Sequence, residues 1–230
     1  MIYNDKKFND KQLIIFDLDG TLINSSPDLA NAVNHMLHSL GRDTFSTDTI
    51  HYWVGNGAQM LVKRALSGKR EIDPNIDERL FNQALEIFLD HYNSHLSIET
   101  VPYPNVISTL QTLQERGYHL AIITNKPYRF VAPILTDLKL DTYFESFLGG
   151  DSLPQKKPHP MPLKHLCKTL DVNIDQSVMV GDSRNDILAA KACGMQSIGV
   201  TYGYNYGEDI NSYNPDLVVD QFQHILPSLL

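Results

Sequence analysis

The sequence lacks the features that mark membrane, disulfide-bonded and nucleic-acid-binding proteins. Its apolar runs are all much shorter than a membrane span. The two cysteines, Cys167 and Cys193, stand apart without metal-ligand spacing. A formal net charge of −8 argues against a nucleic-acid partner. These absences predict a cytoplasmic protein with two reduced thiols that binds neither a membrane nor nucleic acid.

The N-terminus also lacks the pattern of a secretion signal. Residues 1–10 are polar, and the apolar run after them is short and broken by Asp17. The 230 residues are 42% apolar and 20% charged, which is the usual balance of a globular protein. This length exceeds one average domain, falls short of two and is enough to bury a core. We expect a monomer or a weak homodimer.

Short apolar runs alternate with helical patterns along most of the chain. Such runs predict strands that are buried on both faces, as in a parallel sheet. Strands are expected at 13–16, 119–123, 144–148, 178–180, 198–200 and 217–219. The alternation predicts an α/β fold, a Rossmann-like doubly wound parallel sheet with helices on both faces.

Residues 24–97 interrupt this alternation. Their apolar residues recur at helical spacing with no convincing strand, and a break occurs at Gly55-Asn56-Gly57. The segment is too long for an ordinary connection between a strand and its first helix. It therefore predicts an inserted α-helical cap domain at 24–97, with an α/β core formed by 1–23 and 98–230.

Polar side chains follow the three most apolar strands and occupy one further loop. They are Asp17, Asp19, Thr124, Asn125, Lys157, Asp182 and Asp186. The carboxyl ends of parallel strands lie at one edge of a sheet, where clustered carboxylates repel one another unless a cation joins them. Oxygen ligands without His or Cys favour a hard ion, most simply Mg²⁺. A lysine, a hydroxyl and free amides suit a phosphate, so the set predicts a phosphoryl-transfer site.

The pattern resembles the haloacid dehalogenase superfamily of Mg²⁺-dependent phosphatases. Its four motifs are matched in order by residues 17–22, 124–125, 157–158 and 181–186. The helical insertion is similar to the small α-helical cap of that superfamily. More narrowly, residues 52–57 and 156–160 resemble the bacterial phosphoglycolate phosphatases. The resemblance implies hydrolysis of a small phosphate monoester, with 2-phosphoglycolate as the expected substrate.

The resemblance and the chemistry together predict the catalytic and metal-binding roles. Asp17 is expected to be the nucleophile that forms an aspartyl-phosphate, and Asp19 the general acid and base. Mg²⁺ is expected on Asp17, on Asp182 and on the backbone carbonyl of Asp19. Asp186 is expected to lie outside the direct metal ligands and to orient those ligands or a water molecule.

The remaining residues are expected to bind the substrate. Lys157 would offset the carboxylates and, with Thr124 and Asn125, hold the phosphate oxygens. The cap must choose the organic part of the substrate, because the core groups contact only the phosphate. Gly55, Asn56 and Gly57 are the predicted specificity loop, in which backbone donors and the Asn56 amide are left free for a carboxylate.

Alternatives share parts of this pattern. A phosphoryl-accepting receiver module has a similar Asp, Thr, Lys and Mg²⁺ set, but it lacks a cap and an acid at position 19. A sugar phosphatase or a phosphoglucomutase shares the core, and a dehalogenase does not need Asp19. A phosphonatase needs a Schiff-base lysine in the cap, for which Lys63 and Lys69 are candidates. Release of free phosphate from an ester separates a hydrolase from a receiver and a mutase.

Overall fold

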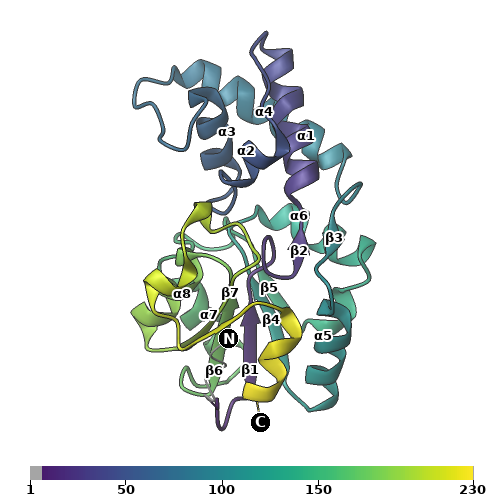
Figure 1. Ribbon diagram of the computed structural model, residues 1–230, viewed down its shortest axis with the longest axis vertical. Coiled ribbons are helices and arrows are strands. Elements are labelled where there is room, and N and C mark those ends of the chain that lie inside the picture. The colour runs from purple at the N-terminus through teal and green to yellow at the C-terminus, as the bar shows by residue number, and fades with distance from the viewer. Residues whose placement is uncertain (1–6, 230) are drawn as a thin grey trace.

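The computed structural model describes residues 7–229, with a parallel sheet below a layer of helices (Figure 1). Residues 1–6 and 230, and the part of the N-terminal prediction that rests on them, lie outside the described residues. The sheet has six strands in the order β5-β4-β1-β6-β7-β8, and all neighbours are parallel. The strands are β1 (Leu13–Phe16), β4 (His119–Ile123), β5 (Ser146–Leu148), β6 (Ser177–Gly181), β7 (Gln196–Val200) and β8 (Leu217–Val219).

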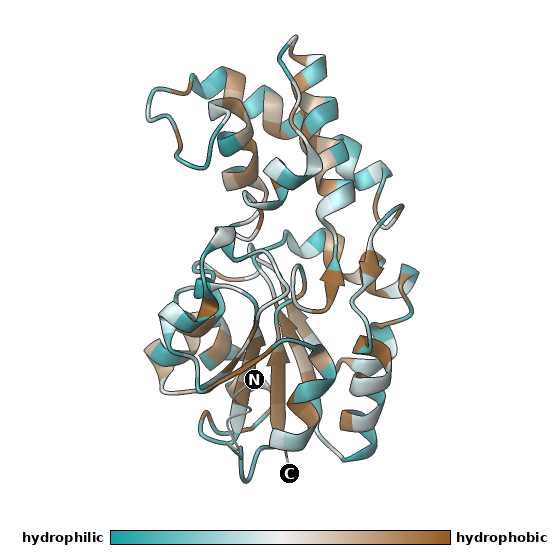
Figure 2. Cartoon of the chain, in the orientation of Figure 1, coloured by the Kyte–Doolittle hydropathy of each residue, from teal (hydrophilic) through white to brown (hydrophobic). Residues whose placement is uncertain are grey.

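Helices cover both faces of this sheet. Successive strand residues point to opposite faces, so Ile14 and Phe16 of β1 belong to one apolar cluster and Leu13 and Ile15 to the other. The strands are accordingly the most apolar part of the core in Figure 2. The first cluster includes residues of α5 (Val106–Glu115) and α6 (Tyr128–Asp137), and the second includes residues of α7 (Met161–Thr169) and α8 (Arg184–Cys193). This arrangement confirms the predicted doubly wound α/β fold.

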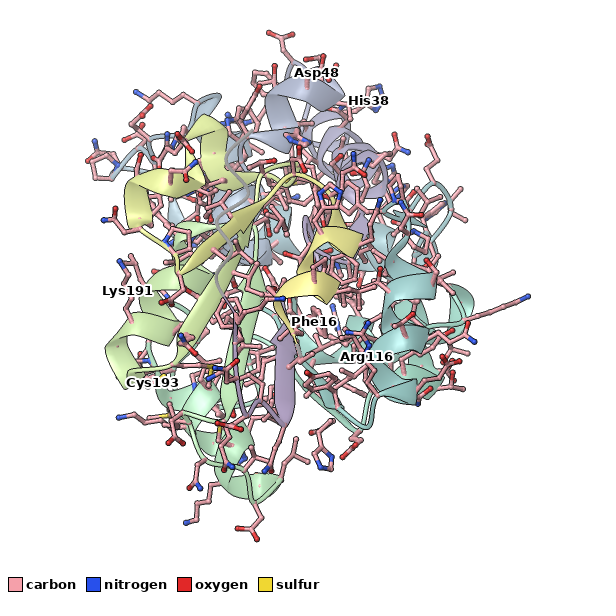
Figure 3. The ribbon with its side chains drawn as sticks, turned by 60° about the horizontal axis from the view of Figure 1, so that its bottom comes forward. Phe16, His38, Asp48, Arg116, Lys191 and Cys193 are labelled. Atoms are coloured by element: carbon pink, nitrogen blue, oxygen red, sulfur yellow. The ribbon has the colours of Figure 1, made fainter. Side chains whose placement is uncertain are left out.

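The view from below places Phe16 in the middle of the core and Cys193 at its edge (Figure 3). Both cysteines are free thiols, as the sequence predicts.

Short 3₁₀ helices complete the core: η1 (Asp141–Tyr143), η2 (Asn205–Gly207), η3 (Ile210–Tyr213) and η4 (Phe222–Ser228).

The predicted helical insertion is present between the first two long strands of the sheet. Its helices are α1 (Ser26–Ser39), α2 (Thr47–His51), α3 (Ala58–Ser67) and α4 (Glu78–Ser94). Pro27 lies in the first turn of α1, where a missing N–H group costs nothing. Helix α3 begins after Gly57 at a φ of 87° and ends at Gly68 in the left-handed conformation. The break that the sequence predicts at 55–57 therefore separates α2 from α3.

The two connections between core and insertion form a small antiparallel pair that the sequence did not suggest. Strand β2 (Ile23–Asn24) pairs with β3 (Val101–Pro102). Buried Asp28 strengthens this junction, because its carboxylate accepts hydrogen bonds from the Thr100 amide at 2.9 Å and the Thr100 hydroxyl at 2.6 Å. Strands of two residues leave no periodic pattern, so only the fold reveals them. Within residues 7–229, no helix has both the length and the apolar character needed to span a membrane.

Candidate functional site

The site is built around Asp17, which directly follows β1. This strand lies in the middle of the sheet, between β4 and β6, so both of its neighbours hold its end in place. The Leu18 amide donates a hydrogen bond to Asp17 Oδ1 at 2.7 Å. The β1 arrow in Figure 1 points toward the helical insertion, so Asp17 lies at the sheet edge that faces the cap. The carboxylate is therefore buried and oriented beneath the cap.

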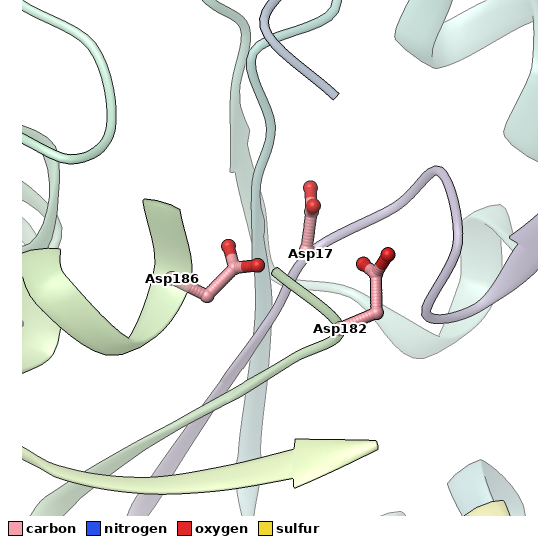
Figure 4. Close-up of side chains that lie close together, drawn as sticks. All are labelled: Asp17, Asp182 and Asp186. Carbon is pink, nitrogen blue, oxygen red and sulfur yellow. The ribbon is translucent and has the colours of Figure 1, made fainter. Parts of the chain in front are cut away.

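Two more carboxylates meet Asp17, one directly after β6 and one in the first turn of α8. Oxygen atoms of Asp17, Asp182 and Asp186 all lie within 4.8 Å of one another (Figure 4). Two glycines make room for Asp182, because a Cβ atom at Gly20 or Gly203 would come within 2.4 Å or 2.2 Å of its side chain. These close approaches explain why small residues face the carboxylate from both loops.

Asp182 and Asp186 are held differently. Asp182 accepts hydrogen bonds from the Thr21 hydroxyl at 2.9 Å and the Tyr204 amide at 2.7 Å. Asp186 forms a capping box with Ser183 at the start of α8, where its Oδ2 accepts from the Ser183 amide and hydroxyl. The helix start thus aims the Asp186 side chain back toward Asp17.

Lys157 joins two of these carboxylates. Its Nζ atom lies 2.9 Å from Asp17 Oδ1 and 2.7 Å from Asp186 Oδ1, and the side chain is buried. Burial alone would lower the pKa of this ammonium, but attraction to Asp17 and Asp186 outweighs burial and raises the pKa. Lys157 therefore carries its charge at the centre of the cluster.

One lysine does not balance three buried carboxylates. Burial, together with repulsion from Asp186 and Asp182, raises the pKa of Asp17 against the opposing effect of Lys157. Burial and repulsion from Asp186 raise the pKa of Asp182 to about 7. Such shifts indicate a shortage of positive charge, and oxygen ligands alone match a hard divalent cation. The donor set therefore fits a divalent metal site.

Asp19 lies apart from this cluster. Its Oδ1 accepts a short hydrogen bond from the Ser25 hydroxyl at 2.5 Å and pairs with Lys126 Nζ at 2.7 Å. The predicted metal ligand at this position is the Asp19 backbone carbonyl and not the side chain, so this orientation leaves the carboxylate available for another role. Lys126 was missed, although its position directly after Thr124 and Asn125 puts it at the same strand end.

Thr124 and Asn125 lie at the end of β4 as predicted, and both are buried. The Thr124 hydroxyl accepts a hydrogen bond from the Lys126 amide at 3.1 Å. Asn125 Nδ2 donates to the Lys157 carbonyl at 3.0 Å and to the Gly55 carbonyl at 3.3 Å. Asn125 therefore ties the lysine loop of the core to the glycine loop of the cap.

The cap loop at 55–57 reaches the site mainly through its glycines. Gly55 and Gly57 line the cavity beside Asp17, and a Cβ atom at Gly57 would lie 2.8 Å from the Asn125 carbonyl oxygen. Asn56 does not line this cavity. Its Oδ1 accepts a hydrogen bond from Arg64 Nη2 at 2.8 Å, which holds the side chain within the cap.

A small cavity of about 40 Å³ lies between the catalytic edge and the cap. Its polar lining comes from Asp17, Asp19, Thr124, Asn125, Lys126 and Tyr92, and apolar cap residues such as Leu61 and Phe88 enclose the other side. One water molecule needs about 10–15 Å³ of such a cavity, so only a small substrate group fits in it. Lys63 and Lys69 do not line this cavity, and Lys63 Nζ instead lies 4.7 Å from the Phe81 ring centroid.

Comparison with known proteins agrees with this geometry. Residues 14–200 match the family model described as haloacid dehalogenase-like hydrolase. The chain is similar to a phosphoglycolate phosphatase of Colwellia psychrerythraea, with 55% identity over 97% of this chain and 99% of the relative. A phosphoglycolate phosphatase of Psychrobacter arcticus is 50% identical over 96% of both chains.

A solved structure gives the same picture of the fold. The crystal structure of a predicted phosphoglycolate phosphatase from Haemophilus somnus superposes with a TM-score of 0.88 and 41% sequence identity. The match covers 95% of this chain and 97% of that one. Core and helical insertion are therefore shared over nearly the full length.

Proposed function

Because the chain belongs to the haloacid dehalogenase-like hydrolases, we propose that it is a phosphoglycolate phosphatase. It hydrolyses 2-phosphoglycolate to glycolate and phosphate, which makes it a phosphoric monoester hydrolase. The observation that carries this function is the meeting of Asp17, Asp182, Asp186 and Lys157 beneath a cap that leaves a small cavity. Relatives of that name align over nearly the whole chain.

The carboxylates of Asp17 and Asp182 and the backbone carbonyl of Asp19 would hold Mg²⁺. When bound, the ion neutralises charge between the nucleophile and the phosphate. Both oxygens of Asp186 already accept hydrogen bonds, from Lys157 and from Ser183. Asp186 therefore orients Lys157 and the loop after β6 in this proposal.

Asp17 and Asp19 divide the chemistry between them. An oxygen of Asp17 attacks phosphorus as the ester P–O bond breaks, and Asp19 gives a proton to the departing glycolate oxygen. Asp19 then takes a proton from the water that attacks the aspartyl-phosphate. The P–O bond to Asp17 breaks, phosphate leaves and the free Asp17 carboxylate returns. The two residues are separated by one position, so the strand end presents both to one phosphate.

Lys157, Thr124 and Asn125 bind the phosphate in this scheme. The Lys157 ammonium lies 2.9 Å from Asp17, so it attracts phosphate oxygens to the nucleophile. Thr124 and the backbone near Asn125 provide neutral donors from the neighbouring strand end. These groups contact the part of the substrate that all phosphate esters share.

Substrate choice falls to the helical insertion, whose proposed limits are residues 24–97, with the core at 1–23 and 98–230. Gly55 and Gly57 bring this segment to the cavity, while Asn56 positions the loop through Arg64. A closed cap excludes water from the reaction and leaves no space for a nucleotide. We also place the enzyme in the cytoplasm, as a monomer or weak homodimer, on the basis of its free thiols and acidic charge.

A phosphate-release screen tests the function. We expect the protein with Mg²⁺ to release phosphate from 2-phosphoglycolate with a higher kcat/KM than from sugar phosphates or nucleotides. Chelation should abolish turnover, and added Mg²⁺ should restore it. Full activity in a metal-free preparation contradicts the metal assignment. A tenfold preference for a sugar phosphate or a nucleotide, about 1.4 kcal/mol of transition-state binding, contradicts the substrate assignment.

A further inference from the structure

One buried cation beside the catalytic edge has no role in the scheme above. Lys126 is the one positively charged side chain among the described residues that line the cavity. Its side chain is 3% exposed, and its Nζ lies 2.7 Å from Asp19 Oδ1. Lys157 already serves the nucleophile and the phosphate. Lys126 therefore sits where the ester oxygen and the organic part of a substrate must lie.

The cap places an unused hydroxyl next to this ammonium. Tyr92 in α4 is almost fully buried and lines the same cavity. Its ring centroid lies 4.9 Å from Lys126 Nζ, and its hydroxyl makes no close hydrogen bond within residues 7–229, although the Lys126 ammonium attracts it from a longer distance. A buried hydroxyl without a partner is costly and indicates a missing ligand. Tyr92 also packs edge to face on Phe130 of the core, which holds its ring in place.

The start of α3 adds a third source of donors. Gly57 and Ala58 line the cavity, and none of the described side chains caps this end of the ten-residue helix. The first amides of a helix lack partners within the helix and carry partial positive charge, so they attract anions. Lysine, tyrosine and helix start thus converge on one cavity from the core, α4 and α3.

We propose that Lys126, the Tyr92 hydroxyl and the first amides of α3 form the subsite for the substrate carboxylate. This inference rests on the proposed function, because the carboxyl carbon of 2-phosphoglycolate is two bonds from the ester oxygen. When that oxygen lies at Asp19, the carboxylate comes within reach of Lys126. The apolar residues Leu61 and Phe88 exclude water, which strengthens the charge interaction. A substrate without a carboxylate leaves these donors unpaired.

Lys126→Met and a matched pair of substrates test this subsite. Ethyl phosphate replaces the carboxylate of 2-phosphoglycolate by a methyl group and keeps the alkyl ester. The ratio of kcat/KM for the two substrates cancels any effect of the variant on Asp19 or on the phosphate. We expect this ratio to fall roughly thirtyfold in Lys126→Met, as for loss of a charged hydrogen bond, and threefold to tenfold in Tyr92→Phe.

Controls separate the subsite from folding and from the function itself. Lys168→Met changes an exposed lysine of α7 and should leave the ratio unchanged. Lys126→Arg should restore part of the preference, and glycolate should inhibit the wild type more strongly than Lys126→Met. If Lys126→Met and Tyr92→Phe lower kcat/KM equally for both substrates, their ratio keeps its wild-type value. The subsite proposal is then wrong, while the proposed phosphatase activity is unaffected. A wild type that turns over both esters without preference overturns the substrate assignment and the subsite together.

Discussion

The catalytic edge of the sheet and the cap wall opposite it differ in how their polar groups are held. At the edge, Asp182 accepts hydrogen bonds from Thr21 and Tyr204 in the adjacent loops, and Asp186 accepts them from Ser183 and Lys157. On the cap wall, within residues 7–229, the Tyr92 hydroxyl makes no close hydrogen bond and no side chain caps the start of α3. A preorganised edge suits the phosphate, which is common to all substrates. A cap wall with unpaired donors suits the organic part of the substrate, which differs from one phosphate ester to another.

The two regions are joined by contacts that involve mostly backbone atoms of the cap. The Gly55 carbonyl accepts from Asn125 Nδ2 at 3.3 Å and from Asn185 Nδ2 at 3.2 Å. Lys156 Nζ donates to the Asn56 carbonyl at 2.9 Å. These bonds hold the glycine loop on the core while its side chains contribute little. The comparison therefore predicts large, general losses from edge variants and smaller, substrate-dependent losses from cap variants.

Among the edge variants, Asp17→Asn should cause the greatest loss of activity. The amide is a poor nucleophile and a weaker metal ligand, so kcat should fall by at least about 10⁴-fold on every ester. Phosphate release and acid-quench trapping of labelled aspartyl-phosphate measure the loss. Asp137→Asn, an exposed change at the end of α6, is the matched control and should be neutral. A variant that keeps a hundredth of the wild-type rate contradicts a nucleophilic Asp17.

Asp19→Asn should have the next largest effect, and the effect should depend on the leaving group. An alkyl ester needs a proton on its departing oxygen, so kcat should fall by about 10²–10⁴-fold. An aryl phosphate such as 4-nitrophenyl phosphate needs no proton there, and its loss should be at least about tenfold smaller. Steady-state kinetics on both esters provide the measurement. Equal losses would mean that Asp19 only holds Lys126 and Ser25 in place.

Gly57→Val tests the contribution of the cap loop to substrate choice. Gly57 has a φ of 87°, and a Cβ atom there would meet the Asn125 carbonyl at 2.8 Å, so the loop must shift. We expect kcat/KM for 2-phosphoglycolate to fall by about tenfold, with a smaller loss on the aryl phosphate. Gly68→Ala adds a side chain at another positive φ, 67°, at the other end of α3 and away from the cavity. If Gly68→Ala reproduces the selective loss, strain in the helix and not the loop contact is responsible.

Much of the catalytic edge was predictable from the chain alone. Asp17 and Asp182 each follow a run of apolar residues, and parallel strands carry their ends to the same edge whatever the loops do. Asp186 follows Asp182 by about one helical turn, so the local backbone alone brings the two residues close together. Lys157 was predicted from its motif, and the structure places it between Asp17 and Asp186.

The cap wall was far less predictable, because its contacts join segments that are distant in the chain. Asn56 was expected at the site from local sequence, yet Gly55 and Gly57 line the cavity while Arg64 of α3 holds Asn56 Oδ1. Lys126 received no role from the sequence, and the fold brings it to Asp19 and to Tyr92 of α4. Local sequence determined which strands form and what chemistry stands at their ends. Only packing of the helical insertion on the core decided which donors face the substrate, since burial and side-chain direction depend on residues from both.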